Sequence, residues 1–330
     1  MGAGQRARLL IGTASWTDPS LIAAGTFYPP SARTPAARLR YYASQFPLVE
    51  IDSSYYGIPA ERAVRGWAER APAGFVFDAK AYALFTRHPT PIASLPKGVR
   101  DALPSALAGV RRVYDHDLPN ELQQELWRRF AEAFQPLRET GKLGAVLFQF
   151  PPWFVPVRES RAYLARLSEL LPGYPISVEL RNPRWFAGGA ERDLLALLRE
   201  HELAYVCADE PQGTTASVPP LVVATAPLAV VRFHGRNAAA WARHGVDVRE
   251  RYDYLYSDDE LRGWLSGIAR LAEEAAEVHL LMNNCVGDKG VRNARDLARL
   301  LRATLLADAL VPPPGQYDEA GATPAQQRLL

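Results

Sequence analysis

The sequence contains only two cysteines in 330 residues, Cys207 and Cys285, and it has no C-x-x-C motif. This scarcity excludes a disulfide framework and a zinc knuckle. No apolar run approaches the roughly 20 residues of a membrane helix. The segment from Met1 to Trp16 lacks the apolar stretch of a signal peptide, and Arg6 stands where N-myristoylation requires Ser or Thr. We therefore expect a cytoplasmic protein that does not associate with a membrane.

The chain also has little net charge, with 38 basic residues against 36 acidic ones and a formal charge of +2. This balance provides no general field to attract nucleic acid or anionic lipid, although a local basic patch is compatible with it. Hydrophobic residues make up 48% and charged residues 22%, which is ordinary for a globular protein with a large core. The length exceeds the roughly 250 residues that a β/α barrel requires, so one domain is sufficient.

Short apolar runs alternate with stretches of helical spacing, which is typical of parallel β/α architecture. Most of these runs are rich in β-branched or aromatic residues, as in strands that are buried on both faces. The eight runs are Leu9 to Thr13, Leu48 to Asp52, Gly74 to Lys80, Leu143 to Phe150, Pro175 to Arg181, Leu203 to Asp209, Leu228 to His234 and Val278 to Asn283. We predict a TIM (β/α)8-type barrel, a single domain over residues 1–308, with a flexible tail over 309–330.

Capping residues mark the starts of several helices. A proline in the first turn and a polar side chain before it are typical of a helix N-terminus. The predicted caps are Thr34 before Pro35, Asn120 before a long amphipathic stretch, and Ser257, which forms a capping box with Glu260. The last helix is expected over about 291–306, with apolar residues on one face.

Two connections are much longer than the two to six residues that are usual in β/α units. They are the segments 81–119 and 235–256, and each follows a predicted strand. Connections of this kind lie at the carboxyl ends of barrel strands, where active sites are found. We interpret both segments as candidate lids. The second contains several aromatic side chains, among them Trp241 and Tyr252.

Polar residues cluster at the ends of these apolar strands. They are Glu50, Asp52, Asp78, Lys80, Gln149, Glu179, Arg181, Arg232, His234, Asn283 and Asn284. Alternate residues of a strand face the same side, so each pair two positions apart points the same way. An unpaired buried charge costs several kcal/mol, so these groups must pair, reach solvent or contact a ligand. Structural ion pairing would explain one pair, whereas the convergence of the whole set favours a functional site.

Lys80 is notable because the chain has only four lysines. A desolvated lysine could form a Schiff base or bind an anion, and a salt bridge to Glu50 or Glu179 would explain it equally well. His234 ends a strand and could act as a general acid or base. A core histidine with satisfied hydrogen bonds is the alternative.

Gly287 and Gly290 follow the eighth predicted strand and precede a helix, where a barrel phosphate site places its backbone N–H groups. Arg232, Arg236 and Lys289 could complete such a phosphate cup. Glycines that terminate or cap a helix are the alternative. Aromatic residues after the strand ends could stack on a sugar or a base, or pack as a roof over the barrel. They are Trp16, Tyr55, Tyr56 and Trp185.

Taken in order, these motifs resemble the YecE-like family, a domain of unknown function. The resemblance rests on Ile11 to Trp16, Glu50 to Tyr56, Phe77 to Lys80, Phe148 to Pro152, Glu179 to Asn182, Trp185 with Phe186, Arg232 to Arg236, Asn283 with Asn284, and Asn293 with Ala294. It spans residues 9–306 and implies a barrel fold, but the family has no settled activity to transfer. Many relatives have His after the paired asparagines, where this chain has Cys285.

The leading functional hypothesis is an enzyme of hydrolase or lyase type that acts on a small anionic or sugar-containing substrate by acid/base chemistry. Glu179 would work with Glu50 or His234, while Arg181, Arg232 and Lys80 would hold negative charge. The other candidate substrate contacts are Asp52, Tyr55, Gln149, Trp185, Arg236, Asn283 and Asn284. A common barrel glycosidase is disfavoured, because Gln149 stands where one of its two carboxylates is expected.

Three alternatives remain open. Lys80 would be the nucleophile of an aldolase. A metal-dependent phosphodiesterase acting on nucleic acid would hold Mg²⁺ or Mn²⁺ through carboxylates. His234 is the one convincing strand-end histidine among six, too few for a histidine-rich metal cluster, so no cofactor is predicted. A protein that binds DNA or a metabolite without chemistry is the third alternative, and the oligomeric state is not indicated.

Overall fold

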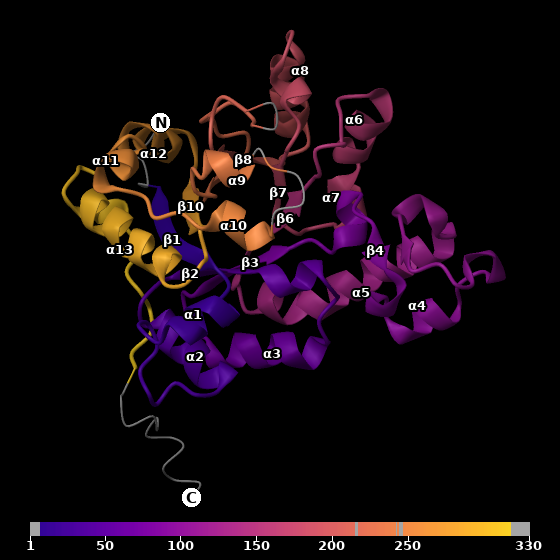
Figure 1. Cartoon of the computed structure of the whole chain (residues 1–330), viewed down its shortest axis with the longest axis horizontal. Coiled ribbons are helices and arrows are strands. Elements are labelled where there is room, and N and C mark those ends of the chain that lie inside the picture. Colours follow the sequence, from indigo (N-terminus) through magenta and orange to yellow (C-terminus); the bar gives the residue numbers. More distant parts are fainter. Residues whose placement is uncertain (1–6, 215–216, 242, 244–246, 318–330) are drawn as a thin grey trace, which may run out of the picture.

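In the computed structural model, eight parallel strands close into a barrel that is surrounded by helices (Figure 1). The structure describes residues 7–214, 217–241, 243 and 247–317. Around the barrel the strands follow the order β1-β10-β9-β8-β7-β6-β3-β2. They are β1 (Arg8–Ala14), β2 (Leu48–Ile51), β3 (Val76–Lys80), β6 (Leu143–Gln149), β7 (Ile176–Glu179), β8 (Ala204–Asp209), β9 (Leu228–Phe233) and β10 (Glu277–Met282). The predicted TIM-type barrel is therefore confirmed, with a strand in each of the eight expected runs.

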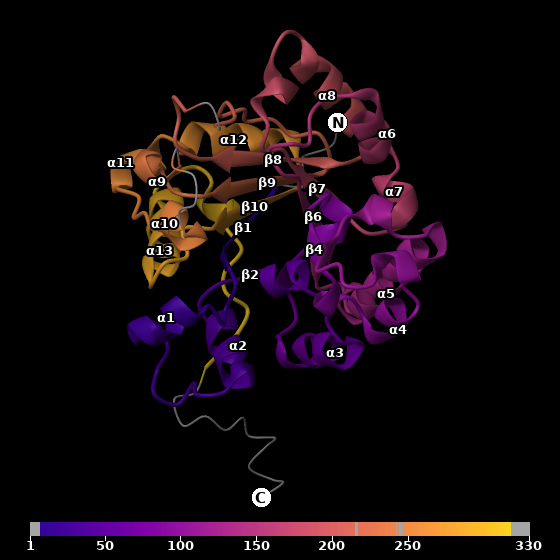
Figure 2. The same ribbon diagram turned by 45° about the vertical axis from the view of Figure 1, so that its right-hand side comes forward.

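Helices cover the outside of the barrel (Figure 2). They are α1 (Pro19–Ala24), α2 (Pro35–Ala43), α3 (Glu61–Arg70), α4 (Lys97–Asp101), α5 (Asn120–Glu139), α6 (Arg158–Ala165), α7 (Leu167–Leu170), α8 (Ala190–Glu200), α9 (Ala238–Trp241), α10 (Val248–Tyr252), α11 (Asp258–Arg262), α12 (Leu265–Glu274) and α13 (Lys289–Arg302). Within the described part of the chain, no helix is long and apolar enough to cross a membrane.

The observed helix caps can be compared with those predicted from the sequence. The Thr34 side chain accepts a hydrogen bond from the Ala37 N–H, and both bonds of the Ser257 capping box are present. The prediction for Asn120 is wrong, because Pro119 occupies the cap position in an extended conformation and Asn120 is the first helical residue. The end predicted for the last helix is also too late. Helix α13 ends at Arg302, so residue 305 lies beyond it.

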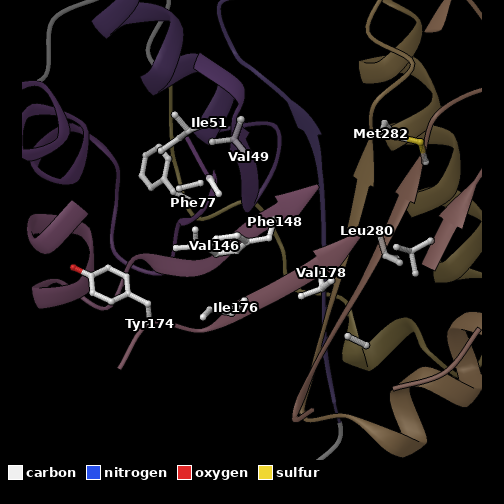
Figure 3. Packing of buried hydrophobic residues seen from close by; sticks show 14 of the residues in the cluster. Val49, Ile51, Phe77, Val146, Phe148, Tyr174, Ile176, Val178, Leu280 and Met282 are labelled. Atoms are coloured by element: carbon white, nitrogen blue, oxygen red, sulfur yellow. The ribbon is translucent and has the colours of Figure 1, made fainter. Parts of the chain in front are cut away.

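Strand side chains that face outwards form the main core against the helices (Figure 3). Val49 of β2, Phe77 of β3, Phe148 of β6 and Val178 of β7 are all fully buried there. Apolar side chains that face inwards form a second, smaller cluster, which closes the barrel interior. Its buried members are Leu10, Leu48, Val76, Leu147, Val206, Val230 and Leu281.

Polar residues lie two positions further along five of the strands that build the inner cluster. They are Glu50, Asp78, Gln149, Arg232 and Asn283, after Leu48, Val76, Leu147, Val230 and Leu281 respectively. Because side chains alternate along a strand, these residues face the same interior as the apolar cluster, nearer the carboxyl ends of the strands. Four of them form a polar layer above the apolar cluster, whereas Asp78 bonds His279, which stands two positions before Leu281 on β10.

The two long connections carry short elements. Segment 81–119 contains β4 (Thr90–Pro91) and β5 (Arg112–Val113), which pair antiparallel, and it also carries α4, which lies beside α5 (Figure 1). It also holds the 3-10 turns Ala83–Thr86, Ile92–Ser94, Ser105–Leu107 and Asp115–Asp117. Helices α9 and α10 lie in segment 235–256 and contact each other.

The described part of the predicted tail follows the surface of the barrel. The Val311 N–H donates to the Leu9 carbonyl over 2.9 Å, and the Gly315 N–H donates to the Ala43 carbonyl over 3.0 Å. These bonds hold residues 311–315 beside β1 and the end of α2. Residues 318–330 of that prediction lie outside the described residues.

Candidate functional site

Arg232 bridges two carboxylates across the top of the barrel interior. Its Nη2 lies 2.7 Å from Oε1 of Glu50 on β2, and its Nη1 lies 2.6 Å from Oε2 of Glu179 on β7. All three side chains are fully buried. Glu50 Oε2 has no hydrogen-bond partner among the described residues. The predicted convergence of these strand-end charges is therefore present. Glu179 Oε1 also makes no hydrogen bond among the described residues, although Arg181 lies beside it.

Glu179 is the more heavily paired of the two carboxylates. Its Oε1 lies 2.6 Å from Nε of Arg181 and 3.2 Å from Nε2 of His234. Arg181 also pairs with Glu210, and its Nη2 lies 3.0 Å from the same ring nitrogen of His234. The other ring nitrogen of His234, Nδ1, lies 2.9 Å from Nδ2 of Asn283.

In this environment the pKa values of Glu50 and Glu179 shift in opposite directions. Burial raises the pKa of Glu50 more than Arg232 and Lys80 lower it. Burial also favours the neutral form of Glu179, but Arg181, Arg232 and His234 outweigh it and hold the pKa of Glu179 well below its ordinary range. Burial and the neighbouring Arg181 lower the pKa of His234 to about 3, so that the imidazole is neutral at physiological pH.

A second pair, Lys80 with Asp52, lies beside this network and is partly open to solvent. The ammonium is 2.9 Å from Oδ1 of Asp52, with side-chain exposures of 14% and 32%. It also lies over the Tyr55 ring, 4.8 Å from its centroid. Burial alone would lower the pKa of Lys80, but the Asp52 carboxylate and Glu50 hold it above its ordinary value. The predicted salt bridge is thus made, with Asp52 rather than Glu50 or Glu179.

Aromatic side chains of segment 235–256 cover the polar layer. The Trp241 and Tyr252 rings lie 6.4 Å and 5.8 Å from the His234 ring, and the Arg181 guanidinium lies over Trp241 at 5.4 Å. His234 is fully buried under them. Gln149, in register with Glu179, is partly exposed, as is Asn283. A ligand would therefore reach Gln149, Asn283 and the Lys80 pair before it reached Glu179.

Several predicted substrate contacts have structural roles instead. Trp185 is fully buried, its indole N–H donates to the Phe154 carbonyl, and its ring stacks on Phe154, so it presents no face to a substrate. Asn284 is also fully buried, and its amide bonds Asn293 and a backbone carbonyl. Arg236 makes two hydrogen bonds to Asp209, of 2.9 Å and 2.6 Å. These three residues were predicted at the site because they follow strand ends. The side chains of Trp185 and Asn284 turn towards neighbouring loops and α13, and that of Arg236 turns to the end of β8.

The predicted phosphate cup is also not formed in this arrangement. The Gly287 N–H donates to Ser20 Oγ over 2.9 Å rather than facing an open position. Lys289 is paired with Asp253. Arg232 and Arg236, the other cations that would have completed the cup, are held by the carboxylates described above. Gly287 therefore serves the turn between β10 and α13, where it has the left-handed φ of 65° that favours glycine, and Gly290 lies in the first turn of α13.

Asp78 lies apart from this network, in a buried triad with two residues of β10. Its Oδ2 is 2.8 Å from Nδ1 of His279, whose Nε2 is 2.8 Å from Glu277 Oε1. Burial opposes the charged imidazole, but the two carboxylates raise the pKa of His279 to about 10. A Cβ on Gly144 would lie 2.5 Å from Asp78 Oδ1 and 2.6 Å from the His279 ring, so glycine makes room for the triad. Sequence reasoning missed His279 because it stands early in a strand.

Other members of the site were missed for different reasons. Glu210 directly follows β8, so the strand-end rule would have found it. Trp153 follows β6 after two prolines and is 56% exposed, and the same rule covers it. His88 lies within segment 81–119, where no periodic pattern indicates its position. Within the described residues, no group of three or more His, Cys, Asp or Glu side chains is placed to hold a metal.

The barrel and its buried polar layer define a TIM-barrel protein with charged groups gathered at the carboxyl ends of its strands. The chain belongs to the DUF72 family, described as a protein of unknown function, whose family model matches residues 10–316. This confirms the resemblance found in the sequence motifs. The chain is 31% identical over 297 residues to the UPF0759 protein YunF of Bacillus subtilis, covering 89% of this chain and 94% of that protein.

Solved structures of the family have the same fold. A DUF72 family protein (EF0366) of Enterococcus faecalis V583 superimposes with a TM-score of 0.72 at 29% identity, covering 90% of this chain and 96% of that one. A DUF72 family protein (TM1631) of Thermotoga maritima MSB8 superimposes with a TM-score of 0.69 at 26% identity, over 89% of this chain and 99% of that one. Family membership thus supports the fold without assigning an activity.

Proposed function

We propose that the protein is an enzyme that acts on a small anionic or sugar-containing substrate, with Glu50 as general acid and Glu179 as its ionised partner. The observation that carries the proposal is one guanidinium, that of Arg232, shared by two fully buried carboxylates. Glu50 Oε2 and Glu179 Oε1 both lack a hydrogen bond, but Glu179 Oε1 lies 2.6 Å from Arg181 Nε, whereas no ion pair engages Glu50 Oε2 among the described residues. Pairs of carboxyl groups in unequal surroundings are a recurrent way to divide acid and stabilising roles at neutral pH.

Charge counting supports a proton on Glu50. The network with its neighbouring pair holds four carboxylates, those of Glu50, Asp52, Glu179 and Glu210, and three cations, those of Lys80, Arg181 and Arg232. A buried excess of negative charge favours uptake of one proton. Glu210 accepts bonds at both oxygens, from Arg181 and the Val218 N–H, whereas Glu50 is bonded at one oxygen. The proton is therefore best placed on the free Oε2 of Glu50.

In this proposal the free oxygen of Glu50 donates a proton to a substrate atom. Glu179 remains ionised, fixes both guanidinium groups and stabilises positive charge that develops in the reaction. Neutral His234 lies against both Arg181 and Glu179 and holds them in position. Because Glu50, Glu179 and His234 are all fully buried, the substrate must displace Trp241 and Tyr252 to reach them, and water is excluded once these rings return.

The test is to incubate the purified protein with a small-metabolite extract and follow all masses with time. We expect the wild type to deplete a phosphorylated or sugar-containing compound, and both Glu50→Gln and Glu179→Gln to leave it unchanged. Glu125→Gln, at an exposed ion pair of α5, is the matched control and should behave like wild type. The proposal is overturned if the wild type changes no metabolite, or if Glu179→Gln changes the same one at the same rate.

Lys80 and metal chemistry are weaker candidates. A Schiff-base lysine must lose its proton readily, whereas Asp52 stabilises the ammonium of Lys80. A Mg²⁺ or Mn²⁺ ion at Glu50, Glu179 or Asp52 would have to displace the arginine or lysine already bound there. Metal analysis of the purified protein, with activity measured before and after addition of a chelator, tests that alternative.

A further inference from the structure

Four aromatic rings form a row along one side of the barrel mouth. The Tyr55 ring lies 5.1 Å from Tyr56 and 5.3 Å from His88, and the His88 ring lies 5.6 Å from Trp153. Tyr56 is 65% exposed and Trp153 is 56% exposed, which is unusual for rings of this size. The residues come from the segments that follow β2, β3 and β6, three neighbouring strands of the barrel. We call these four residues the aromatic row.

We infer that the aromatic row is a binding subsite for a sugar ring of the substrate. This inference rests on the proposed function, since it names the class of molecule that the same site would take. Trp153 is 56% exposed, and an exposed indole can cover the apolar face of a pyranose ring. The sugar would stack on Trp153 and lie beside Tyr55, whose ring carries Lys80 over one face, with its hydroxyl groups turned towards the polar layer.

Hydroxyl-binding groups stand directly beside the row. Lys80 lies over the Tyr55 ring and is bonded to Asp52, so an ammonium and a carboxylate are presented together. An ammonium has three donors and a carboxylate has about four acceptor positions, so the pair can bind vicinal hydroxyls while it remains intact. An ion pair of this kind leaves little net charge, which suits an uncharged ring better than a phosphate.

The two cations in direct contact with the row are both paired, which disfavours a nucleic-acid strand. Binding a polyanion requires cations that are free to neutralise successive phosphates. Here Lys80 is paired with Asp52, and Arg87, whose carbonyl accepts a bond from the Trp153 indole, is paired with Asp115. Burial and then Lys80 lower the pKa of His88 to about 4, so this ring adds no positive charge at neutral pH.

The loops that carry the row are held in place before any ligand arrives. His88 Nδ1 lies 2.8 Å from Thr86 Oγ1, and the Trp153 Nε1–H donates to the Arg87 carbonyl over 3.2 Å. The Arg87 guanidinium lies over the Tyr163 ring at 3.8 Å. Preorganised rings lose little freedom on binding, which favours affinity for a small ligand.

The test uses saturation-transfer NMR on the wild-type protein with a mixed panel of methyl pyranosides, uronic acids and sugar 1- and 6-phosphates, and separately with a ten-residue oligothymidylate. We expect ring protons of at least one panel member to receive saturation. Trp153→Ala and Tyr55→Ala should weaken its binding about tenfold or more, a loss of about 1.4 kcal/mol. Tyr114→Ala, at an exposed ring stacked on His116 outside the row, is the control and should bind like wild type.

The inference is overturned if no panel member receives saturation, if Trp153→Ala binds as tightly as wild type, or if only the oligothymidylate binds. Its failure is distinguishable from failure of the proposed function. Glu50→Gln and Glu179→Gln should keep the saturation-transfer signal while they abolish turnover, so binding tests the row and turnover tests the carboxylates. Folding of each variant is checked by its far-UV circular dichroism and its urea midpoint.

Discussion

The guanidinium of Arg232 on β9 lies 2.6 Å from Glu179 on β7, across the strand that separates them, and 2.7 Å from Glu50 on the other side of the barrel. One cation therefore ties together three strands at the level of the polar layer. Loss of one partner leaves an unpaired charge in a fully buried site, and this costs far more than loss of a surface pair. The arrangement makes stability, as well as activity, sensitive to these residues.

The first prediction concerns Arg232→Met. We expect the free energy of unfolding to fall by about 3–5 kcal/mol, because two buried carboxylates lose their shared cation. Urea denaturation at pH 7, followed by tryptophan fluorescence, measures this change. Arg65→Met removes an exposed pair with Glu61 and should cost no more than about 1 kcal/mol. Equal losses in the two variants would show that the Arg232 network contributes no more than a surface pair.

The second prediction separates the two carboxylates by their protonation. Glutamine mimics a protonated glutamate, so Glu50→Gln should change stability at pH 7 much less than Glu179→Gln, which removes the ionised partner of two arginines. If the two substitutions cost the same in urea denaturation at pH 7, the assignment of the proton to Glu50 is wrong. Asp258→Asn, at an exposed pair with Arg299, provides a surface reference.

Glu179 and Glu50 should contribute to the pH dependence of stability with opposite signs. Glu179 has a folded pKa below its ordinary 4.5, so its contribution is present above pH 4.5 and is lost as the pH falls through the folded pKa. Glu50 has a folded pKa above 4.5, so folding takes up a proton and the wild type loses stability relative to Glu50→Gln as the pH rises from 4.5. Urea midpoints between pH 3 and 8 measure both trends, and parallel curves would contradict them.

The third prediction concerns the triad below the polar layer. His279→Gln should reduce the free energy of unfolding by about 3–5 kcal/mol at pH 7, because it leaves Asp78 buried without its charged partner. The folded pKa of about 10 exceeds the ordinary 6.5, so the contribution of His279 is complete below pH 6.5 and is lost as the pH rises through 10. The difference between wild type and variant should shrink accordingly. His116→Gln, at an exposed histidine, should stay within about 0.5 kcal/mol of wild type throughout.

The fold was predictable because it depends on patterns that are local in sequence. Each run of apolar residues that we expected to be a strand is one, since burial on both faces requires such a run wherever it lies. The polar layer was predictable for a related reason. Because side chains alternate between the two faces of a strand, Glu50 lies above Leu48 and Arg232 above Val230 regardless of how the loops fold.

The remainder of the site depends on contacts between segments far apart in the chain. Trp185 and Trp153 both follow strand ends, but Trp185 turns into the core against Phe154 whereas Trp153 turns outwards against His88. Their sequence surroundings do not distinguish these outcomes, because each depends on how the neighbouring loop packs. The partner of Lys80 could not be predicted for the same reason. The structure is needed to show that the turn Asp52–Tyr55 brings Asp52, rather than another carboxylate, next to Lys80 on β3.

The fourth prediction concerns Lys80 as a nucleophile. We expect no covalent adduct when the protein is incubated with pyruvate or dihydroxyacetone at pH 7 and reduced with borohydride, because Asp52 keeps the amine protonated. Intact-protein mass spectrometry is the measurement. A mass increase in the wild type that disappears in Lys80→Arg, but persists in the surface variant Lys97→Arg, would restore the aldolase interpretation.

The last prediction concerns access to the polar layer. Neutral histidines react with diethyl pyrocarbonate when they are reachable, and His234 is neutral but fully buried beneath Trp241 and Tyr252. Trp241→Ala should therefore speed modification of His234 severalfold, as measured by peptide mass spectrometry. The exposed His116 serves as an internal reference and should react at the same rate in both proteins.

Trp153→Ala is the matched control for that experiment, because it removes an indole from the mouth without uncovering His234. Its His234 should react at the wild-type rate. If His234 in the wild type already reacts as fast as His116, segment 235–256 opens freely and the closed arrangement is one of several that exchange rapidly. If instead Trp241→Ala leaves His234 unreactive, the indole is not what shields it. Entry to Glu179 would then have to come from the side of Lys80 and the aromatic row.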